Sequence, residues 1–344
     1  QRTLYSKRDL LLSEGIMYSC GEFENDANLA CHFCERSALL FPSEILSSGS
    51  AQENQIYTRQ YIDNLAKHIN ASEANELILS FEGLVHLTKK ELTNLREWLM
   101  IYTDNILIVM YTREPLSYAK SAMSQRVKYG KRTGAGLDLP FLNYKYLLEK
   151  FIAIFGKSNL NVRKFDRTSF IGGDVVLDFL SIFDFKDISL DKYVLSSESS
   201  ANPSLSLEAI LVGERIISLL DNIMISKINF EDLFLPSLKK IGGEKFVLSY
   251  IQNQIIKSLA EEHTRYLKEE FSIFFEGTPP TFTYHKRPSW RSIDTQAKKI
   301  IFNCLPEYQL SKSSLLKILK QRIKSFLIIT RYFIRKPSTV IKRK

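Results

Sequence analysis

The sequence has no long apolar run, only four cysteines, and just 14 glycines and 10 prolines in 344 residues. No apolar stretch approaches the roughly 18 residues that a membrane-spanning helix needs, so we expect a chain that does not cross a membrane. The cysteines are too few and too unevenly spaced for a disulfide framework, which indicates a reducing compartment and a cytoplasmic protein. The composition, 44% hydrophobic and 25% charged, is typical of a globular chain.

Two of the cysteines lie close together in the stretch Cys31-His32-Phe33-Cys34, and Cys20 precedes them. This spacing is found among zinc ligands. However, no second CxxC pair and no HxxxH pair supplies the rest of a four-ligand set. We therefore expect ordinary thiols here and no metal site.

The positive charge is concentrated near the end of the chain. The formal net charge is +9, yet residues 311–344 contain eleven Lys and Arg and no acidic residue. The other 310 residues carry 36 Lys and Arg against 38 Asp and Glu, so they are close to neutral. A nearly neutral body argues against a nucleic-acid-binding body, whereas the basic segment is expected to meet a membrane surface, RNA or an acidic partner.

The order of apolar segments predicts alternating helices and strands. Residues 3–14 are expected to form a helix that ends at Gly15, and strands are expected at 76–83, 106–112 and 160–166. The segment 106–112 (ILIVMYT) is apolar on both faces, as in the centre of a parallel sheet. We therefore predict an α/β fold with a doubly wound, mostly parallel sheet.

The helices expected between and after these strands are longer. Thr88 followed by Glu91 has the pattern of a capping box at a helix start. Residues 195–275 have little strand character and predict a helical lobe within a domain of residues 1–292, and 293–344 predict a basic helical extension. The helices expected in the α/β part cover 55–69, 88–102, 115–130, 141–155 and 170–184.

The corner after the strand 106–112 has the residue types of a phosphate site. Arg113 follows the strand, and Pro115 suits the first position of the next helix. Ser117, Ser121 and Ser124 recur at intervals that place them on one face of that helix. In parallel sheets, ligands bind where strands end and helices begin, and a guanidinium with nearby hydroxyls suits a phosphate monoester.

A structural interpretation of the same corner stays open. The serines are small enough to let the helix pack closely on the sheet. Arg113 can pair with Glu114 or with Glu82 instead of a ligand. Spacing alone does not choose between these two interpretations.

The strand–Arg–x–Pro–helix pattern, with a serine eight positions after Arg113, resembles the 3′-phosphate-binding element of the P-loop sulfotransferases. These enzymes use 3′-phosphoadenosine 5′-phosphosulfate (PAPS). The segment ELILSFEGL before it, and FGKSNLNVRKFDRTSFIGGDVVLDFL after it, are similar to further elements of the family. The resemblance covers roughly residues 1–290, and it implies a P-loop-like sulfotransferase fold that carries the helical lobe of bacterial, glycan-modifying members.

The resemblance lacks one element. The family has a first strand and a glycine-, lysine- and threonine-containing loop around the 5′-phosphosulfate, and this sequence contains neither GxxxxGK[ST] nor a Lys-Thr-Gly-Thr loop. Gln1 falls where a glutamine commonly follows that loop in bacterial members. We expect either that the loop lies upstream or that the chain no longer transfers sulfate.

The resemblance implies a role for each matching residue of the nucleotide site. Arg113 and Ser121 would hold the 3′-phosphate of PAPS, with Ser117 and Ser124 as helpers. Ser80 would contact the bridging phosphate. Phe165 stands where the family often has a tyrosine near the adenine, although a core phenylalanine is an alternative.

The catalytic base implied by the resemblance is Glu82, which would remove the proton of the acceptor hydroxyl. His86, four residues later, is a competing base. Glu82 also has a structural interpretation, in which it caps the next turn or pairs with Arg113. No metal is implied.

The sequence thus predicts a PAPS-dependent sulfotransferase that acts on a carbohydrate or other cell-envelope hydroxyl. A non-catalytic relative that binds or scaffolds at a membrane is an alternative, as is another nucleotide-dependent transferase such as a glycosyltransferase. The basic segment 312–335 has the pattern of an amphipathic helix, which suits peripheral binding to anionic lipid or packing on the body.

Overall fold

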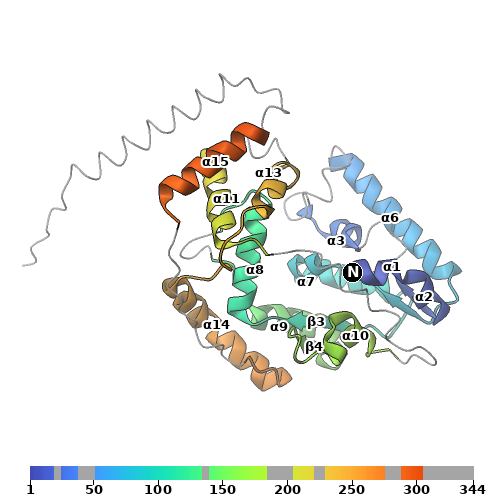
Figure 1. Ribbon diagram of the computed structural model, residues 1–344. Coiled ribbons are helices and arrows are strands. Elements are labelled where there is room, and N and C mark those ends of the chain that lie inside the picture. Colours follow the sequence, from blue (N-terminus) through green and yellow to red (C-terminus); the bar gives the residue numbers. More distant parts are fainter. Residues whose placement is uncertain are drawn as a thin grey trace, which may run out of the picture. The chain divides into compact units, whose positions relative to one another are not determined.

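The computed structural model describes residues 1–18, 25–37, 51–133, 139–183, 204–220, 229–275 and 288–304. The chain, drawn as a ribbon in Figure 1, divides into two compact units. Each unit has its own buried core. The first unit comprises Gln1–Glu114, Leu142–Ala201 and Ala260–Glu276. The second unit comprises Pro115–Phe141, Asn202–Leu259 and Gly277–Lys344.

The strands that the structure describes all lie in the first unit and form two parallel pairs. These are β1 (Ile16–Tyr18) with β2 (Glu76–Ile78), and β3 (Ile108–Thr112) with β4 (Leu160–Lys164). In the second pair, Thr112 lies opposite Lys164, so both strands end at the same edge. The residues that follow these two positions are therefore held side by side.

Some helices of the first unit begin where the sequence supplies a side-chain cap. The Thr88 side chain accepts a hydrogen bond from Glu91 N, and Glu91 bonds back to Thr88, which completes a capping box. Asn143 caps another helix in the same way by accepting from Tyr146 N. The α-helices are α1 (Arg2–Ser6), α2 (Arg8–Ser13), α3 (Ala27–Phe33), α6 (Ala51–Ala71), α7 (Lys89–Leu99), α9 (Tyr144–Phe155) and α10 (Val175–Leu180), and the 3₁₀ helices are η1 (Glu82–His86), η3 (Lys157–Asn159) and η4 (Ile171–Gly173).

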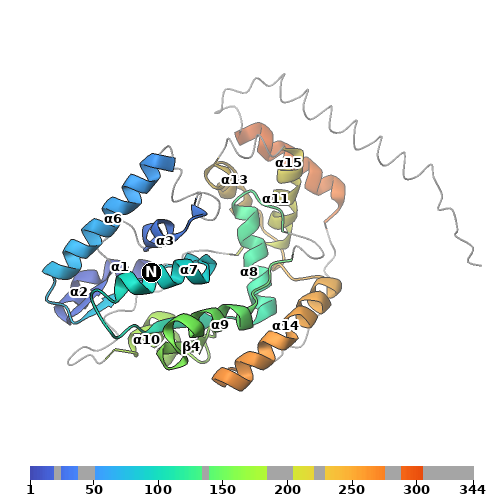
Figure 2. The same ribbon diagram turned by 180° about the vertical axis from the view of Figure 1, so that it is seen from behind.

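The larger core of the first unit lies between its helices. Leu65 of α6, Leu92 of α7 and Leu148 of α9 are fully buried in it. Helices α3 and α6 pack side by side, as do α7 and α9, and Figure 2 shows the same packing from behind. A smaller core joins α2, β1, β2 and α10 through apolar residues that include Leu11 and Leu180.

In the described part of the second unit the secondary structure is helical. It contains α8 (Pro115–Lys128), α11 (Leu207–Leu219), α13 (Phe230–Lys239), the first part of α14 (Tyr250–Phe271) and α15 (Trp290–Cys304). Helix α11 packs against α8, α13 and α15. A Cβ atom on Gly213 would lie only 2.4 Å from Val127 Cγ1, so the close crossing of α11 and α8 requires glycine at this position.

Most of the expected elements are present with shorter bounds. The helix expected at 3–14 is interrupted at Lys7 and forms α1 and α2, while Gly15 follows them with φ +79°, as expected of a helix-ending glycine. The strand expected at 76–83 ends at Ile78, because Ser80 bonds to Asp26 and not to a neighbouring strand. The helix expected at 170–184 is reduced to η4 and α10.

The described residues contain two separate two-stranded sheets, so the doubly wound sheet stays a prediction. The basic segment 312–335, most of the expected extension 293–344, and Cys20 lie outside the described residues. Among the residues that are described, no helix is long and apolar enough to cross a membrane.

Candidate functional site

Arg113 and Phe165 meet at the carboxyl ends of β3 and β4. Each follows the last residue of its strand, and the backbone N–H of Phe165 donates to Thr112 O at 2.7 Å, which continues the parallel pairing beyond the strands. The guanidinium carbon of Arg113 lies 5.5 Å from the centre of the Phe165 ring, within cation–π distance. Phe165 is 40% exposed, so part of its ring is accessible to a ligand.

The backbone of Arg113 is held by one hydroxyl. Tyr144, the buried first residue of α9, accepts a hydrogen bond from Arg113 N at 3.0 Å and donates to Arg113 O at 2.8 Å. Both backbone polar groups of Arg113 are thereby bonded at the point where the strand ends. The guanidinium therefore extends from a fixed backbone position.

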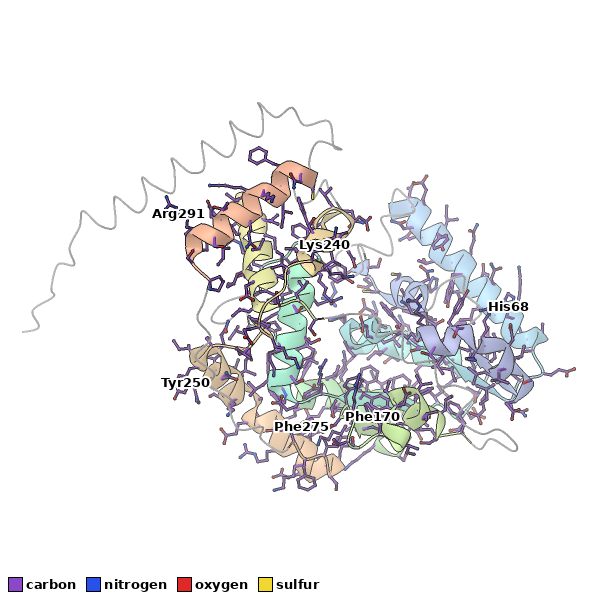
Figure 3. All side chains as sticks on the ribbon, viewed as in Figure 1. His68, Phe170, Lys240, Tyr250, Phe275 and Arg291 are labelled. Carbon is purple, nitrogen blue, oxygen red and sulfur yellow. The ribbon has the colours of Figure 1, made fainter. Side chains whose placement is uncertain are left out.

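An aromatic cluster supports the Phe165 ring. The ring centre of Phe165 lies 6.3 Å from Tyr111 and 5.3 Å from Phe170, and Tyr111 and Phe170 are 6.0 Å apart, all in edge-to-face contact. Phe170, labelled in Figure 3, is buried. The exposed Phe165 ring is therefore supported from below by Tyr111 and by the buried Phe170.

Tyr111 is fixed at its other end by α10. Its hydroxyl donates to Asp178 Oδ2 at 2.6 Å, and Arg163 lies 3.3 Å from the same carboxylate oxygen. Burial, and after it the Asp178 carboxylate, raise the pKa of the Tyr111 phenol well above its usual value. The phenol therefore stays protonated and keeps its hydrogen bond across the neutral pH range.

The predicted serines lie on α8 in the second unit. Ser121 is exposed, Ser117 is half-buried, and Ser124 is buried with no hydrogen-bond partner for its Oγ. Arg113 belongs to the first unit and the serines belong to the second, and the two units are described separately. Joint binding of one phosphate by Arg113 and Ser121 therefore stays a prediction.

Ser80 lies just beyond β2 and is held by Asp26, whose side chain is fully buried. Ser80 N donates to Asp26 Oδ2 at 2.5 Å, and Asp26 N donates back to Ser80 O at 3.0 Å. Tyr61 donates to the other carboxylate oxygen of Asp26 at 2.6 Å. The amide of Gln1 lies 3.3 Å from both Ser80 O and Ser80 Oγ, so the chain after β2 is anchored at this residue.

The two candidate bases are the first and last residues of η1. A 3₁₀ helix has about three residues per turn, so Glu82 and His86, four positions apart, project about 120° from one another. Glu82 is exposed. His86 keeps an exposed surface, but partial burial of its ring lowers its pKa, and the charge of Lys150 lowers it further against the opposing effect of Glu82. His86 is therefore largely neutral at neutral pH, and the choice of base between these two residues stays a prediction.

The cysteine pair lies inside the first unit. Cys31 and Cys34 are both buried in its larger core, and burial raises the pKa of the Cys34 thiol. No group of three or more His, Cys, Asp and Glu side chains is arranged to hold a metal ion in the described part of the chain.

Three residues that organise the site were not predicted from the sequence. Tyr144 and Asp26 act over long sequence separations, and no local pattern marks them. Lys150 could have been found from the sequence, because it lies on the apolar face of α9 between Leu147 and Phe151, where a charged residue is unexpected.

Comparison with known proteins adds no function. No family model matches the sequence, and no solved structure matches it. An uncharacterized protein from Archaeoglobus fulgidus is 30% identical over 141 residues, which cover 41% of this chain and 38% of the archaeal protein. The chain therefore spans well under half of that relative's length.

Proposed function

We propose that the chain binds a 3′-phosphoadenosine nucleotide and transfers sulfate from PAPS to a hydroxyl of a carbohydrate or cell-envelope acceptor. The observation that carries this proposal is the contact between Arg113 and the exposed Phe165 ring at the carboxyl ends of two paired parallel strands. This is the position at which α/β proteins bind nucleotides. A guanidinium beside an exposed ring suits a phosphate attached to a nucleoside.

In this proposal Arg113 binds the 3′-phosphate through two parallel hydrogen bonds, and Phe165 stacks on the adenine. The resemblance also assigns Ser121, which is exposed on α8, to the same phosphate as an uncharged donor, with Ser117 as a helper. Ser80 contacts the bridging phosphate. These roles follow the resemblance of the Arg–x–Pro–helix element to the sulfotransferase family.

Transfer requires one base and one leaving group. The acceptor oxygen attacks the sulfur and forms the new S–O bond, while the bond between sulfur and the phosphate oxygen breaks and 3′-phosphoadenosine 5′-phosphate departs with the electron pair. The proton of the acceptor hydroxyl passes to the carboxylate of Glu82. His86 is the alternative base, because its neutral ring can accept a proton at neutral pH.

The proposal is tested by calorimetry with 3′-phosphoadenosine 5′-phosphate. Loss of a charge-assisted contact in Arg113→Ala should weaken binding about 10- to 100-fold. Arg59→Ala, which removes an exposed arginine from α6, is the matched control and should bind like the wild type. Absence of binding by the wild type, or equal affinity in Arg113→Ala, would exclude a nucleotide site at Arg113.

The catalytic step is tested separately with Glu82→Gln. This variant should keep nucleotide affinity and lose sulfate transfer, whereas His86→Gln should retain transfer. The reverse pattern would assign the base to His86. Nucleotide binding without transfer by the wild type would favour the non-catalytic binding protein.

A further inference from the structure

Lys150 is a buried lysine whose hydrogen bonds both go to the turn that carries the candidate bases. Its side chain lies on α9 and the residue is 4% exposed. Lys150 Nζ donates to Val85 O and to Leu87 O, each at 2.7 Å. Arg36 donates to His86 O at 3.4 Å, so three successive carbonyls of one turn accept from cationic side chains.

Packing alone does not account for a lysine at this position. An ammonium group is costly to bury unless it is well solvated by hydrogen bonds. Burial lowers the pKa of Lys150 to about 8, against the opposing effect of the Glu91 carboxylate on α7. The compensating interactions are the two carbonyls of the turn and the Phe151 ring, 5.4 Å away.

Two long backbone hydrogen bonds join the turn to its flanks. Within η1 and its flanks, Leu84 N donates to Phe81 O at 3.4 Å and Leu87 N to Leu84 O at 3.2 Å, both long distances for such bonds. The next helix is fixed independently, because Glu91 accepts from Thr88 N and from Glu35 N, each at 2.7 Å. The bonds from Lys150 and Arg36 therefore add cross-element contacts that help to fix the orientation of η1.

We propose that Lys150 is a positioning residue that holds the Glu82–His86 turn so that Glu82 faces the acceptor hydroxyl. The inference rests on the proposed sulfate transfer. Lys150 does not touch the reacting atoms; its ammonium fixes the carbonyls of Val85 and Leu87, and the turn between β2 and α7 keeps one orientation. Nucleotide binding at Arg113 and Phe165 does not depend on this contact.

The test compares Lys150→Met with Lys145→Met. Lys145 lies on the same helix but is partly exposed and pairs with Glu262 at 2.8 Å, so its replacement leaves the turn untouched. Two charge-assisted hydrogen bonds are lost in Lys150→Met, and amide exchange at Leu87 should rise at least about tenfold. Exchange inside α9 should not change. Unchanged exchange in the turn, or an equal effect in Lys145→Met, overturns the proposal.

The kinetic readout separates positioning from general stability. In Lys150→Met, kcat for sulfate transfer should fall at least about tenfold, while the Kd for 3′-phosphoadenosine 5′-phosphate changes less than about twofold. An unchanged kcat overturns the positioning role. Failure of the wild type to bind the nucleotide would instead refute the proposed function, and the exchange measurement would still report on the turn.

The wild type supplies a second measurement if Lys150→Met does not fold. Raising the pH from about 7 to about 9.5 removes the charge of Lys150 and weakens its two hydrogen bonds. Glu91 and His86 are the titratable groups coupled to it electrostatically. Exchange protection at Leu87, corrected for the intrinsic effect of pH, should fall relative to α9. Constant relative protection overturns the proposal.

Discussion

At the scale of single residues, the candidate site depends on the contact between Arg113 and Phe165. The cation and the ring come from neighbouring strand ends and are 5.5 Å apart. The ring rests on Tyr111 and Phe170, so ligand binding does not have to order it. A preorganised ring contributes more to affinity than a mobile one of the same size.

Replacing Phe165 should weaken nucleotide binding through loss of stacking. Phe165→Ala is expected to lower the affinity for 3′-phosphoadenosine 5′-phosphate by about 1–3 kcal/mol, the usual contribution of one stacked base. Phe165→Tyr, which keeps the ring, should bind within about twofold of the wild type. Calorimetry on the two variants decides the point, and equal affinity in Phe165→Ala would remove the ring from the site.

His263 makes the stability of the first unit depend on pH. It is buried on α14, and burial lowers its pKa below the 6.5 of the unfolded chain, against the opposing effect of Glu262. Between these two pKa values the unfolded chain binds more protons than the folded chain, so the free energy of unfolding rises with pH across this window. The contribution of His263 to stability is lost as the pH falls through the same window. Urea titrations of the wild type and His263→Gln should diverge in slope below pH 6.5, by at most about 1.4 kcal/mol per pH unit. Parallel curves would contradict this.

The sequence left Arg113 open between ligand binding and pairing with Glu114 or Glu82, and only the resemblance to the sulfotransferases implied a phosphate-binding role. The sequence did not indicate the hydroxyl of Tyr144 that fixes the Arg113 backbone, since that contact joins two distant segments. The role of Phe165 was left open between stacking and core packing. The structure places it at the surface with 40% exposure, and its contact with a ligand stays a prediction.

At the scale of elements, the start of α7 is bonded to a distant segment of the first unit. The buried Glu91 accepts from Thr88 N at 2.7 Å, from the Thr88 hydroxyl at 2.9 Å and from Glu35 N at 2.7 Å. Burial raises the pKa of the Glu91 carboxyl. The hydrogen bonds, above all the one from the Thr88 backbone, outweigh burial and hold this pKa below its usual value. One carboxylate thus joins the start of α7 to the segment after α3.

Glu91→Ala should therefore lower the free energy of unfolding more than the loss of an ordinary helix cap does. It leaves two backbone N–H groups without their acceptor, and we expect a loss of about 2–4 kcal/mol of unfolding free energy, against about 1 kcal/mol for Thr88→Ala. Glu97→Ala, at an exposed position on the same helix, is the control and should change stability by less than about 0.5 kcal/mol. Chemical denaturation measures all three. Equal losses for Glu91→Ala and Glu97→Ala would show that the cap is unimportant.

Local signals in the sequence predicted element starts better than element ends. The capping box at Thr88 was predicted and is confirmed, because its two residues are only three positions apart and bond to each other. The strand predicted to reach residue 83 ends at Ile78, because Ser80 bonds to the distant Asp26. Long-range hydrogen bonds of this kind leave no periodic pattern in the sequence.

At the scale of the whole molecule, the chain combines a unit that contains paired parallel strands with a helical unit and a basic C-terminal segment. Strand order across a full sheet depends on contacts between distant segments, so the doubly wound arrangement was the least accessible part of the sequence prediction. The archaeal relative is uncharacterized, and its alignment covers 41% of this chain, so it assigns no activity.

The basic segment should bind anionic lipid. Each Lys or Arg near an anionic surface contributes about 1 kcal/mol, so the full chain should bind vesicles that contain phosphatidylserine and dissociate as salt is raised. A variant with four glutamine substitutions (K317Q, K320Q, R322Q and K324Q) should bind at least about tenfold more weakly. Equal sedimentation with anionic and neutral vesicles would contradict a membrane role for this segment.

The central claim is that Arg113 recognises a 3′-phosphate. The most direct measurement compares the affinities of 3′-phosphoadenosine 5′-phosphate and adenosine 5′-phosphate, which differ only in that group, for the wild type and Arg113→Ala. The wild type should prefer the 3′-phosphorylated nucleotide about 10- to 100-fold, and Arg113→Ala should lose the preference while its affinity for adenosine 5′-phosphate stays the same. A preference that survives in Arg113→Ala, or a wild type that does not distinguish the two nucleotides, would contradict the claim.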